Sequence, residues 1–294
     1  MMGAIIGDIA GSRYEFSPVK DKDFSLFPEG CEVTDDSVMT VAVAEVLLDL
    51  KGDESDDEIK ERLAGNMKKW GSKYPDAGYG GRFAEWLQSD SIEPYNSYGN
   101  GSAMRVAAVG WLYDDLETTR HMARLTAEVT HNHPEGIKGA ESVAAAMYMG
   151  RTGSTKEEIK EYVEKEFGYD LSRPYDEVRE NCTFNETCQV SVPEAFIAFL
   201  EGNTYTDAVG NAIYLGGDAD TQACIAGAIA EAFYDDNEDE EIRIPFDIWL
   251  AGFHYLPKDM EKVVNRFYNR VRPWLDEDKI DEEEADESDS VLLN

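Results

Sequence analysis

The sequence predicts an all-α fold, a compact single-domain multi-helix bundle, and three observations carry that prediction. Apolar residues recur at helical spacing along most of the chain, as in 56–70, where Ile59, Leu63, Met67 and Trp70 share one face. No segment of useful length alternates β-branched and polar residues as a strand does. Several apolar segments are rich in alanine and glycine, which lets helices pack closely in the centre of a helical body.

Helical spacing and start signals together place the predicted helices along the chain. Hydroxyl or acidic residues, which are preferred N-caps, stand before many of them, including Ser102, Thr206 and Asp220. Pro134 suits the first turn of a helix, and Pro257 comes just before another. In chain order, we predict helices at 38–50, 56–70, 103–113, 117–130, 135–149, 155–167, 192–200, 205–215, 221–234 and 259–271.

Composition limits both the domain organisation and the partners. We expect one domain over residues 1–274, followed by an acidic, disordered tail at 275–294, because so charged a segment has too little apolar surface to fold. The net charge of −34 argues against direct binding to nucleic acid or to an anionic membrane, since both would be repelled. Four scattered cysteines and the absence of a signal-peptide pattern favour a cytoplasmic protein.

Two acidic motifs stand at the starts of predicted helices. Thr34-Asp35-Asp36-Ser37 precedes one helix, and Asp218, Asp220 and Thr221 precede another. Each acid alone could serve as a helix cap. A cap needs a single acid, however, and four carboxylates brought together would repel one another unless cations compensated them. Carboxylate and hydroxyl oxygens suit Mg²⁺, Mn²⁺ or Ca²⁺, so the sequence predicts a site for two divalent cations if the two starts meet.

Three other stretches are weaker signals when each is taken alone. The glycine-rich segment around Asp8 is typical of tight helix packing. The segment 99–102 before a predicted helix could cradle an anion at a helix start, although a plain turn would have the same sequence. His131 and His133 flank an asparagine, and ordinary polar loop histidines are the better interpretation, because no third zinc ligand stands nearby.

In combination, these motifs resemble the ADP-ribosylglycohydrolase family, which includes the dinitrogenase-reductase-activating glycohydrolases. The matching segments run in family order from residue 3 to about residue 234. They are "GAIIGDIAGSRYEF", "TDDSVMTVAVAEVLL", "YGNGSAMRVAAVGWL", "THNHPEG" and "GGDADTQACIAGAIAEAFY". The resemblance implies an all-α bundle with a central metal cleft. It also implies hydrolysis of the glycosidic bond at the anomeric carbon of ADP-ribose, with two Mg²⁺ or Mn²⁺ ions.

The resemblance also assigns roles to residues. It implies metal ligation by Thr34, Asp35, Asp36, Asp218, Asp220 and Thr221, catalytic roles for Glu15, Asp35 and Asp36, and substrate binding by Gly99, Asn100, Gly101, Ser102 and His131. In this interpretation Glu15 lies outside the metal set and handles protons. The segment 151–190 does not align with the family pattern, so the choice of substrate stays open there.

The sequence leaves alternatives to this function open. The substrate could be an ADP-ribosylated protein, an ADP-ribose-containing small molecule or another nucleoside-diphosphate sugar. A catalytically silent relative that only binds ADP-ribose, or that serves a structural role, is the alternative from another class. A silent protein has no need to keep four mutually repelling acids, so the motifs favour an enzyme. The sequence does not indicate an oligomeric state.

Overall fold

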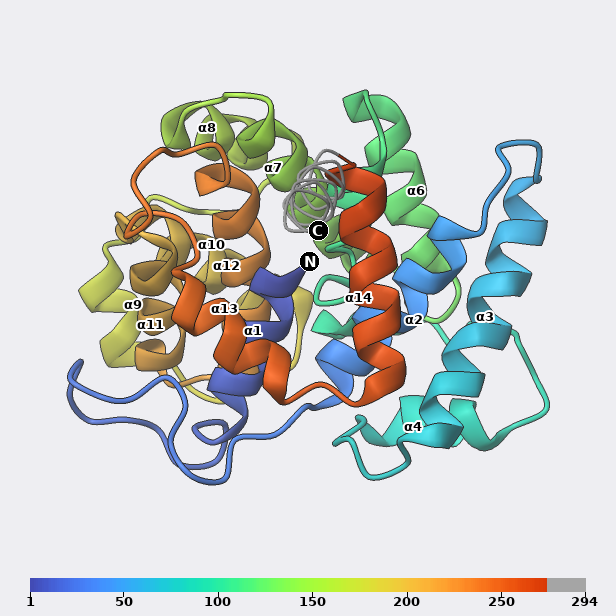
Figure 1. The fold of residues 1–294 in the computed structure, drawn as a ribbon, viewed down its shortest axis with the longest axis horizontal. Coiled ribbons are helices and arrows are strands. Elements are labelled where there is room, and N and C mark those ends of the chain that lie inside the picture. The colour runs from blue at the N-terminus through green and yellow to red at the C-terminus, as the bar shows by residue number, and fades with distance from the viewer. Residues whose placement is uncertain (274–294) are drawn as a thin grey trace, which may run out of the picture.

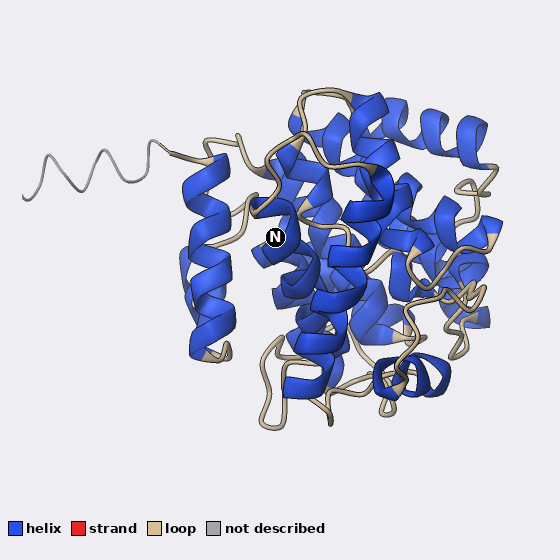
Figure 2. Cartoon of the chain, turned by 90° about the vertical axis from the view of Figure 1, so that its right-hand side faces the viewer, coloured by secondary structure: helices blue, strands red, loops and turns tan. Residues whose placement is uncertain are grey.

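The computed structural model describes residues 1–273 and confirms the all-α prediction (Figure 1). Over these residues the chain forms α-helices joined by loops, and the side view shows no strand among them (Figure 2). One isolated bridge pairs Gly99 with Thr187. The expected tail at 275–294 lies outside the described residues.

The helices follow the chain with short connections. They are α1 (Met2–Ser12), α2 (Asp35–Leu48), α3 (Asp56–Lys73), α4 (Gly81–Gln88), the 3₁₀ turn η1 (Asn100–Ser102), α5 (Val109–Leu112), α6 (Leu116–Glu128), α7 (Pro134–Arg151), α8 (Lys156–Phe167), α9 (Tyr175–Asn181), α10 (Cys188–Glu201), α11 (Tyr205–Leu215), α12 (Ala219–Tyr234), α13 (Phe246–His254) and α14 (Lys258–Val271).

The centre of the bundle is α12, which packs on α1, α7, α10 and α11. All but one of its residues are buried, and α1 is buried over all but its last residue. The two helices meet backbone to backbone through small residues. A Cβ added to Gly7 would lie 2.1 Å from the carbonyl oxygen of Ala223, and one added to Gly11 would lie 2.4 Å from the Cα of Asp220. Glycine at these positions therefore brings the end of α1 against the start of α12.

A second group of helices lies beside this centre. In Figure 1, α2, α3, α6 and α14 stand on one side of α1 and α12, and α2 packs on both α3 and α14. The start of α2 reaches across to α1 and α12. Of the site residues predicted from sequence, Asp35 and Asp36 stand on α2, and Asp220 and Thr221 stand on α12. The others lie on loops or on η1.

One predicted helix is wrong over most of its length. The segment 103–113 was expected to be helical throughout, but residues 103–108 form turns, and only α5 is α-helical. Val106, Ala107 and Ala108 are fully buried there, so the apolar run that indicated a helix instead fills the core as an irregular segment. The helices α1, α4, α9 and α13 were not predicted, because α1 is rich in glycine and the other three are short.

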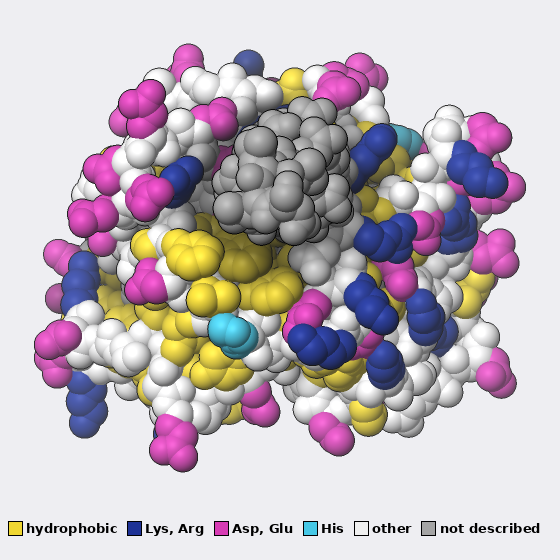
Figure 3. Space-filling model, in the orientation of Figure 1, with side chains coloured by type: hydrophobic (Ala, Val, Ile, Leu, Met, Phe, Trp, Pro, Cys, Tyr) yellow, Lys and Arg dark blue, Asp and Glu magenta, His cyan; other side chains and the backbone are white. Residues whose placement is uncertain are grey.

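The surface separates into regions of different character. On the face in Figure 3, lysine and arginine side chains gather over α3 and α14, among them Lys69, Lys73 and Arg266. Hydrophobic side chains gather over α13, where Phe246 and Leu250 are exposed. Among residues 1–273, no helix has both the length and the apolar character that crossing a bilayer requires.

Candidate metal centre and active site

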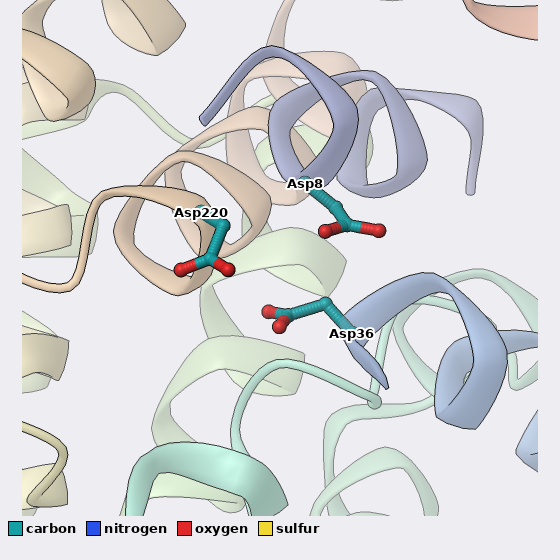
Figure 4. A group of neighbouring side chains, drawn as sticks. All are labelled: Asp8, Asp36 and Asp220. Carbon is teal, nitrogen blue, oxygen red and sulfur yellow. The ribbon is translucent and has the colours of Figure 1, made fainter. Parts of the chain in front are cut away.

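Three buried carboxylates from three helices point toward one another and form an acidic centre (Figure 4). Asp8 comes from α1, Asp36 from the first turn of α2 and Asp220 from the first turn of α12. Each is at most 4% exposed, and one oxygen of each lies within 4.8 Å of the others. The two acidic helix starts that the sequence singled out therefore meet in space.

Asp8 supplies the cap of α2 from another helix. The backbone N–H groups of Thr34 and Ser37 each donate to Oδ2 of Asp8 at 3.1 Å. The hydroxyl groups of Thr34 and Ser37 also donate to the Asp8 carboxylate. Thr34, at the N-cap position, makes no capping bond with its own side chain. Both oxygens of Asp8 are thus engaged, and Asp35 and Asp36 are not needed to hold the helix start.

Asp36 presents an unpaired oxygen to the centre. Its Oδ2 accepts a long hydrogen bond of 3.4 Å from the hydroxyl of Thr221, whereas its Oδ1 is buried without a partner among the described residues. A buried carboxylate oxygen without a donor is costly, unless a cation compensates it. The donor chemistry at this point, carboxylate and hydroxyl oxygens, fits a hard divalent cation.

A second group of carboxylates shares Asp220 with the first. Oxygens of Glu15, Asp218 and Asp220 lie within 4.8 Å of one another. The amide of Asn100 donates to Oδ2 of Asp218 at 2.7 Å and to the hydroxyl of Ser191 at 3.0 Å, which fixes the position of Asp218. Two groups of acids with one common member provide oxygen donors for up to two neighbouring cations.

The pKa values in this centre are raised, and burial is the main cause. Burial raises the pKa of Asp8 and of Asp218 to about 6, against the hydrogen bonds that each accepts. For Asp36 and Asp220, burial and then the charge of a neighbouring aspartate hold the pKa well above its usual value. Burial, followed by repulsion from Asp220, raises the pKa of Glu15 to about 8. Without compensating cations, several of these groups would therefore stay protonated near neutral pH.

A cavity of about 430 Å³ opens above the centre. This volume suits a ligand of nucleotide size. Its charged and polar lining includes Glu15, Thr34, Asp35, Asp36, Arg82, Arg105, Asn100, His131, Glu186, Asp218, Asp220 and Thr221, and its remaining wall includes Phe16, Tyr95, Gly99 and Gly101. Asp8 does not line the cavity; it lies on the interior side, where it caps α2.

His131 faces the cavity as a neutral imidazole. Burial, with the nearby charge of Arg105, lowers its pKa well below the usual value. Arg105 donates to the hydroxyl of Thr130 at 2.9 Å, and that hydroxyl lies 2.7 Å from Nδ1 of His131. When the hydroxyl accepts from Arg105 and donates its own proton to Nδ1, the imidazole proton lies on Nε2. A Cβ built on Gly101 would lie 3.3 Å from Nε2, so glycine lets the loop approach this nitrogen.

The structure brings together most, but not all, of the residues that the sequence singled out. Asp35 lines the cavity, and its backbone N–H donates to the carbonyl of Ala77 at 2.7 Å. Ser102 does not line the cavity. It is fully buried, and its hydroxyl donates to the carbonyl of Gly136 at 2.7 Å, so it supports the loop from within. The 99–102 segment is only one 3₁₀ turn, without the helix that an anion site at a helix start needs.

Two features of the centre were not anticipated from sequence. Asp8 was attributed to helix packing alone, yet it also caps α2. The resemblance places Glu15 outside the metal set, yet its carboxylate lies close enough to Asp218 and Asp220 to share a cation with them. The sequence signal for the role of Asp8 was its place beside Gly7 on a helix of small residues. Such a helix packs closely on its neighbours, so the carboxylate of Asp8 can reach the start of α2.

Comparison with known proteins identifies relatives along nearly the whole chain. The sequence profile described as ADP-ribosylglycohydrolase matches residues 1–277. The chain is 30% identical to the ADP-ribosylhydrolase ARH3 of Mus musculus, over 80% of this chain and 82% of that protein. It is 29% identical to the ADP-ribosylhydrolase ARH3 of Homo sapiens, over 80% and 84%. A solved structure titled "ADP-ribosylglycohydrolase-related protein complex" has the same fold, with a TM-score of 0.67 at 22% identity, over 92% of this chain and 95% of that chain.

Proposed function

Because the chain belongs to the ADP-ribosylglycohydrolase family and is a hydrolase, we propose that it cleaves the glycosidic bond at the anomeric carbon of ADP-ribose with the help of two divalent cations. The substrate is an ADP-ribosylated protein or an ADP-ribose-containing small molecule. The observation that carries this proposal is the convergence of carboxylates at the base of a cavity, with Oδ1 of Asp36 buried and unpaired among the described residues.

The residues present fit two cations of the Mg²⁺ or Mn²⁺ type. Asp36, Asp220 and Thr221 would hold one, and Asp218 and Asp220 the other, with Glu15 as a further oxygen donor in reach. Thr34 and Asp35 stand at the edge of the same site. When bound, such cations supply positive charge that orients sugar hydroxyls and acidifies water. Asp8 would keep the start of α2 in place, so that Asp36 stays aimed at the centre.

Proton transfer would fall to the acids that line the cavity. Hydrolysis adds a water oxygen to the anomeric carbon, breaks the bond to the leaving atom and gives that atom a proton. Asp35 or Asp36 would accept the proton of the water, and Glu15 would donate the proton to the leaving atom. Glu15 suits the second task because it lines the cavity beside Asp218 and Asp220 and is only partly buried, so a leaving atom can reach it.

The other wall of the cavity would hold the nucleotide. Gly99 and Gly101 approach His131 closely there without side-chain bulk, and the neutral His131 ring would contact the nucleotide. Arg82 lines the same cavity and provides an exposed positive charge suited to phosphate.

The experiment that tests the function is a panel of substrates incubated with the purified protein. ADP-ribose joined through serine, through arginine, through a nucleic-acid base and through a small ester would each be supplied with Mg²⁺ or Mn²⁺, and released ADP-ribose would be measured. Release from one linkage that chelation abolishes supports the proposal. Binding of ADP-ribose without release from any member would indicate a catalytically silent relative. Release from a different nucleoside-diphosphate sugar alone would identify another hydrolase.

A further inference from the structure

Two exposed phenylalanine rings meet at the mouth of the cavity. Phe16 is 78% exposed and Phe184 is 45% exposed, and their ring centroids lie 5.8 Å apart with the planes tilted by 35°. Phe16 lines the cavity and directly follows Glu15. The two rings come from loops that are distant in the sequence, so the fold brings them together.

The loop that carries Phe16 is held on both sides of it. The hydroxyl of Tyr14 donates to the carbonyl of Ser25 at 2.7 Å, and its ring packs edge-on against Phe24 at 5.2 Å. Farther along, Arg179 donates to the carbonyl of Val19 at 3.2 Å. The exposure of Phe16 is therefore a property of an anchored loop, and not of a loose one.

The loop that carries Phe184 is tied to the cavity wall. The carbonyl of Glu186 accepts from the backbone N–H of Asn100 at 2.7 Å, and Thr187 pairs with Gly99. The side-chain oxygen of Asn185 accepts from the N–H and the hydroxyl of Thr187, at 2.9 and 2.6 Å. Phe184 therefore stands at a fixed place relative to the 99–101 segment and relative to Asp218, which Asn100 holds.

We propose that the Phe16–Phe184 pair binds the polypeptide next to the modified residue of an ADP-ribosylated substrate. This inference rests on the proposed function. If the nucleotide lies along Gly99, Gly101 and His131 and the leaving atom lies at Glu15, the rest of the leaving group must pass over the neighbouring Phe16. A small leaving group ends at Glu15 and leaves both rings in water. A peptide continues onto them and buries them, which favours its binding.

A third exposed phenylalanine provides a matched control. Phe246 on α13 is 72% exposed, close to the value for Phe16, but it does not line the cavity. Removal of its ring changes the exposed aromatic area of the protein by a similar amount, without touching the proposed acceptor surface. An effect of Phe16 or Phe184 that Phe246 does not share would therefore belong to their position.

The test compares two substrates with the same linkage. One is a peptide of about ten residues in which a single residue carries ADP-ribose. The other is the same ADP-ribosylated amino acid without the rest of the peptide, with its amino and carboxyl groups blocked as amides. For wild type and for Phe16→Ala, Phe184→Ala and Phe246→Ala, kcat/KM would be measured on both. We expect the peptide-to-amino-acid ratio of kcat/KM to fall about tenfold in Phe184→Ala and in Phe16→Ala, mainly through KM, and to stay unchanged in Phe246→Ala. Phe184→Leu should recover part of the ratio.

The outcomes separate this inference from the proposed function. A wild type that cleaves the blocked amino acid as well as the peptide, with the ratio unaffected in Phe184→Ala, overturns the peptide surface and leaves the hydrolase intact. An equal loss on both substrates would mean that the rings only support the cavity, and it overturns the inference as well. A wild type that cleaves neither substrate, nor any other ADP-ribose linkage, overturns both.

Discussion

Two helices of this protein begin with nearly the same sequence and put it to different uses. The start of α2 reads Thr34-Asp35-Asp36-Ser37, and the start of α3 reads Ser55-Asp56-Asp57-Glu58. At α3 the motif is a capping box, in which Ser55 accepts from the N–H of Glu58 and Glu58 accepts from the N–H of Ser55. Its two aspartates lie at the surface, where Asp56 contacts His121 at 3.0 Å and Asp57, with its side chain 94% exposed, contacts Lys60 at 3.1 Å.

At α2 the cap comes from elsewhere in the fold. Asp8 on α1 takes the hydrogen bonds that a local cap would take, and Asp36 is 1% exposed with one oxygen unpaired among the described residues. The comparison teaches that an acidic helix start becomes a candidate metal site when another element relieves it of capping. The local sequence does not reveal this, because the cap is a long-range contact.

The largest expected difference between the two starts is in turnover. Asp36→Asn keeps the shape of the side chain but removes a charge that the cations need, so we expect hydrolysis of ADP-ribosyl substrate to be lost. Asp57→Asn, at the equivalent position of α3, should leave turnover unchanged and alter stability by less than about 0.5 kcal/mol. Rates of ADP-ribose release measure both. Full activity of Asp36→Asn would mean that α2 carries only a cap.

The next effect separates proton transfer from metal binding at Glu15. In Glu15→Gln we expect turnover to fall by about 10²–10⁴-fold, the usual scale for loss of a positioned acid or base. Binding of metal and of ADP-ribose should remain near that of wild type, as calorimetry would show. Loss of one cation together with activity would make Glu15 a ligand, which its closeness to Asp218 and Asp220 would then explain.

A smaller effect concerns the two caps themselves. Asp8→Ala leaves the buried N–H groups of Thr34 and Ser37 without partners, and we expect it to lower the free energy of unfolding by about 1–3 kcal/mol. It should also weaken metal binding, because Asp36 is no longer held. Ser55→Ala should cost about 1 kcal/mol and leave metal binding unchanged. Urea denaturation gives both stabilities. Equal metal affinity in the two variants would remove Asp8 from the account.

The mildest test varies the pH of the metal-free protein. Burial raises the pKa of Asp8 and of Asp218 to about 6 in the folded state, and that of an unfolded aspartate is about 3.9. The folded state therefore binds more protons than the unfolded state at these two groups. Their contribution to the free energy of unfolding is largest below about pH 4 and decreases as the pH rises to 6 and beyond. We expect the melting temperature without metal to be several degrees lower at pH 8 than at pH 5.

Controls make this test specific to the centre. Asp36→Asn should reduce the pH slope, because it removes one buried acid, while Asp57→Asn should not. Saturating Mg²⁺ should abolish or reverse the slope in wild type, because cations favour the charged carboxylates. A slope that neither Mg²⁺ nor Asp36→Asn affects would come from the general acidity of the chain.

How far the sequence predicts this molecule depends on whether each signal is local. The long amphipathic helices, such as α3 and α6, were anticipated within a few residues, because their apolar spacing is a local property. The helix α1 was missed, because Gly3, Gly7 and Gly11 disfavour a helix locally, and only the facing backbone of α12 explains them. The buried segment 103–108 was wrongly predicted as helix for the converse reason, since its apolar residues carry no sign of the turns that they form.

The same division applies to the candidate site. The paired acids at Asp35–Asp36 and Asp218–Asp220 could be read from spacing and resemblance, because both motifs are contiguous. The cap role of Asp8 could not, because it depends on a contact between α1 and α2. Ser102 was assigned to substrate on its neighbours in the sequence, yet its hydroxyl donates to the carbonyl of Gly136 in the interior.

The central claim, that the start of α2 is a metal site and the start of α3 is a cap, is tested most directly by calorimetric titration of the metal-free protein. Wild type and Asp57→Asn should each bind two Mg²⁺ or Mn²⁺ ions with the same affinity, and Asp36→Asn should lose at least one of them while remaining folded by circular dichroism. Two ions bound by Asp36→Asn with wild-type affinity, or no ion bound by wild type, would contradict the account.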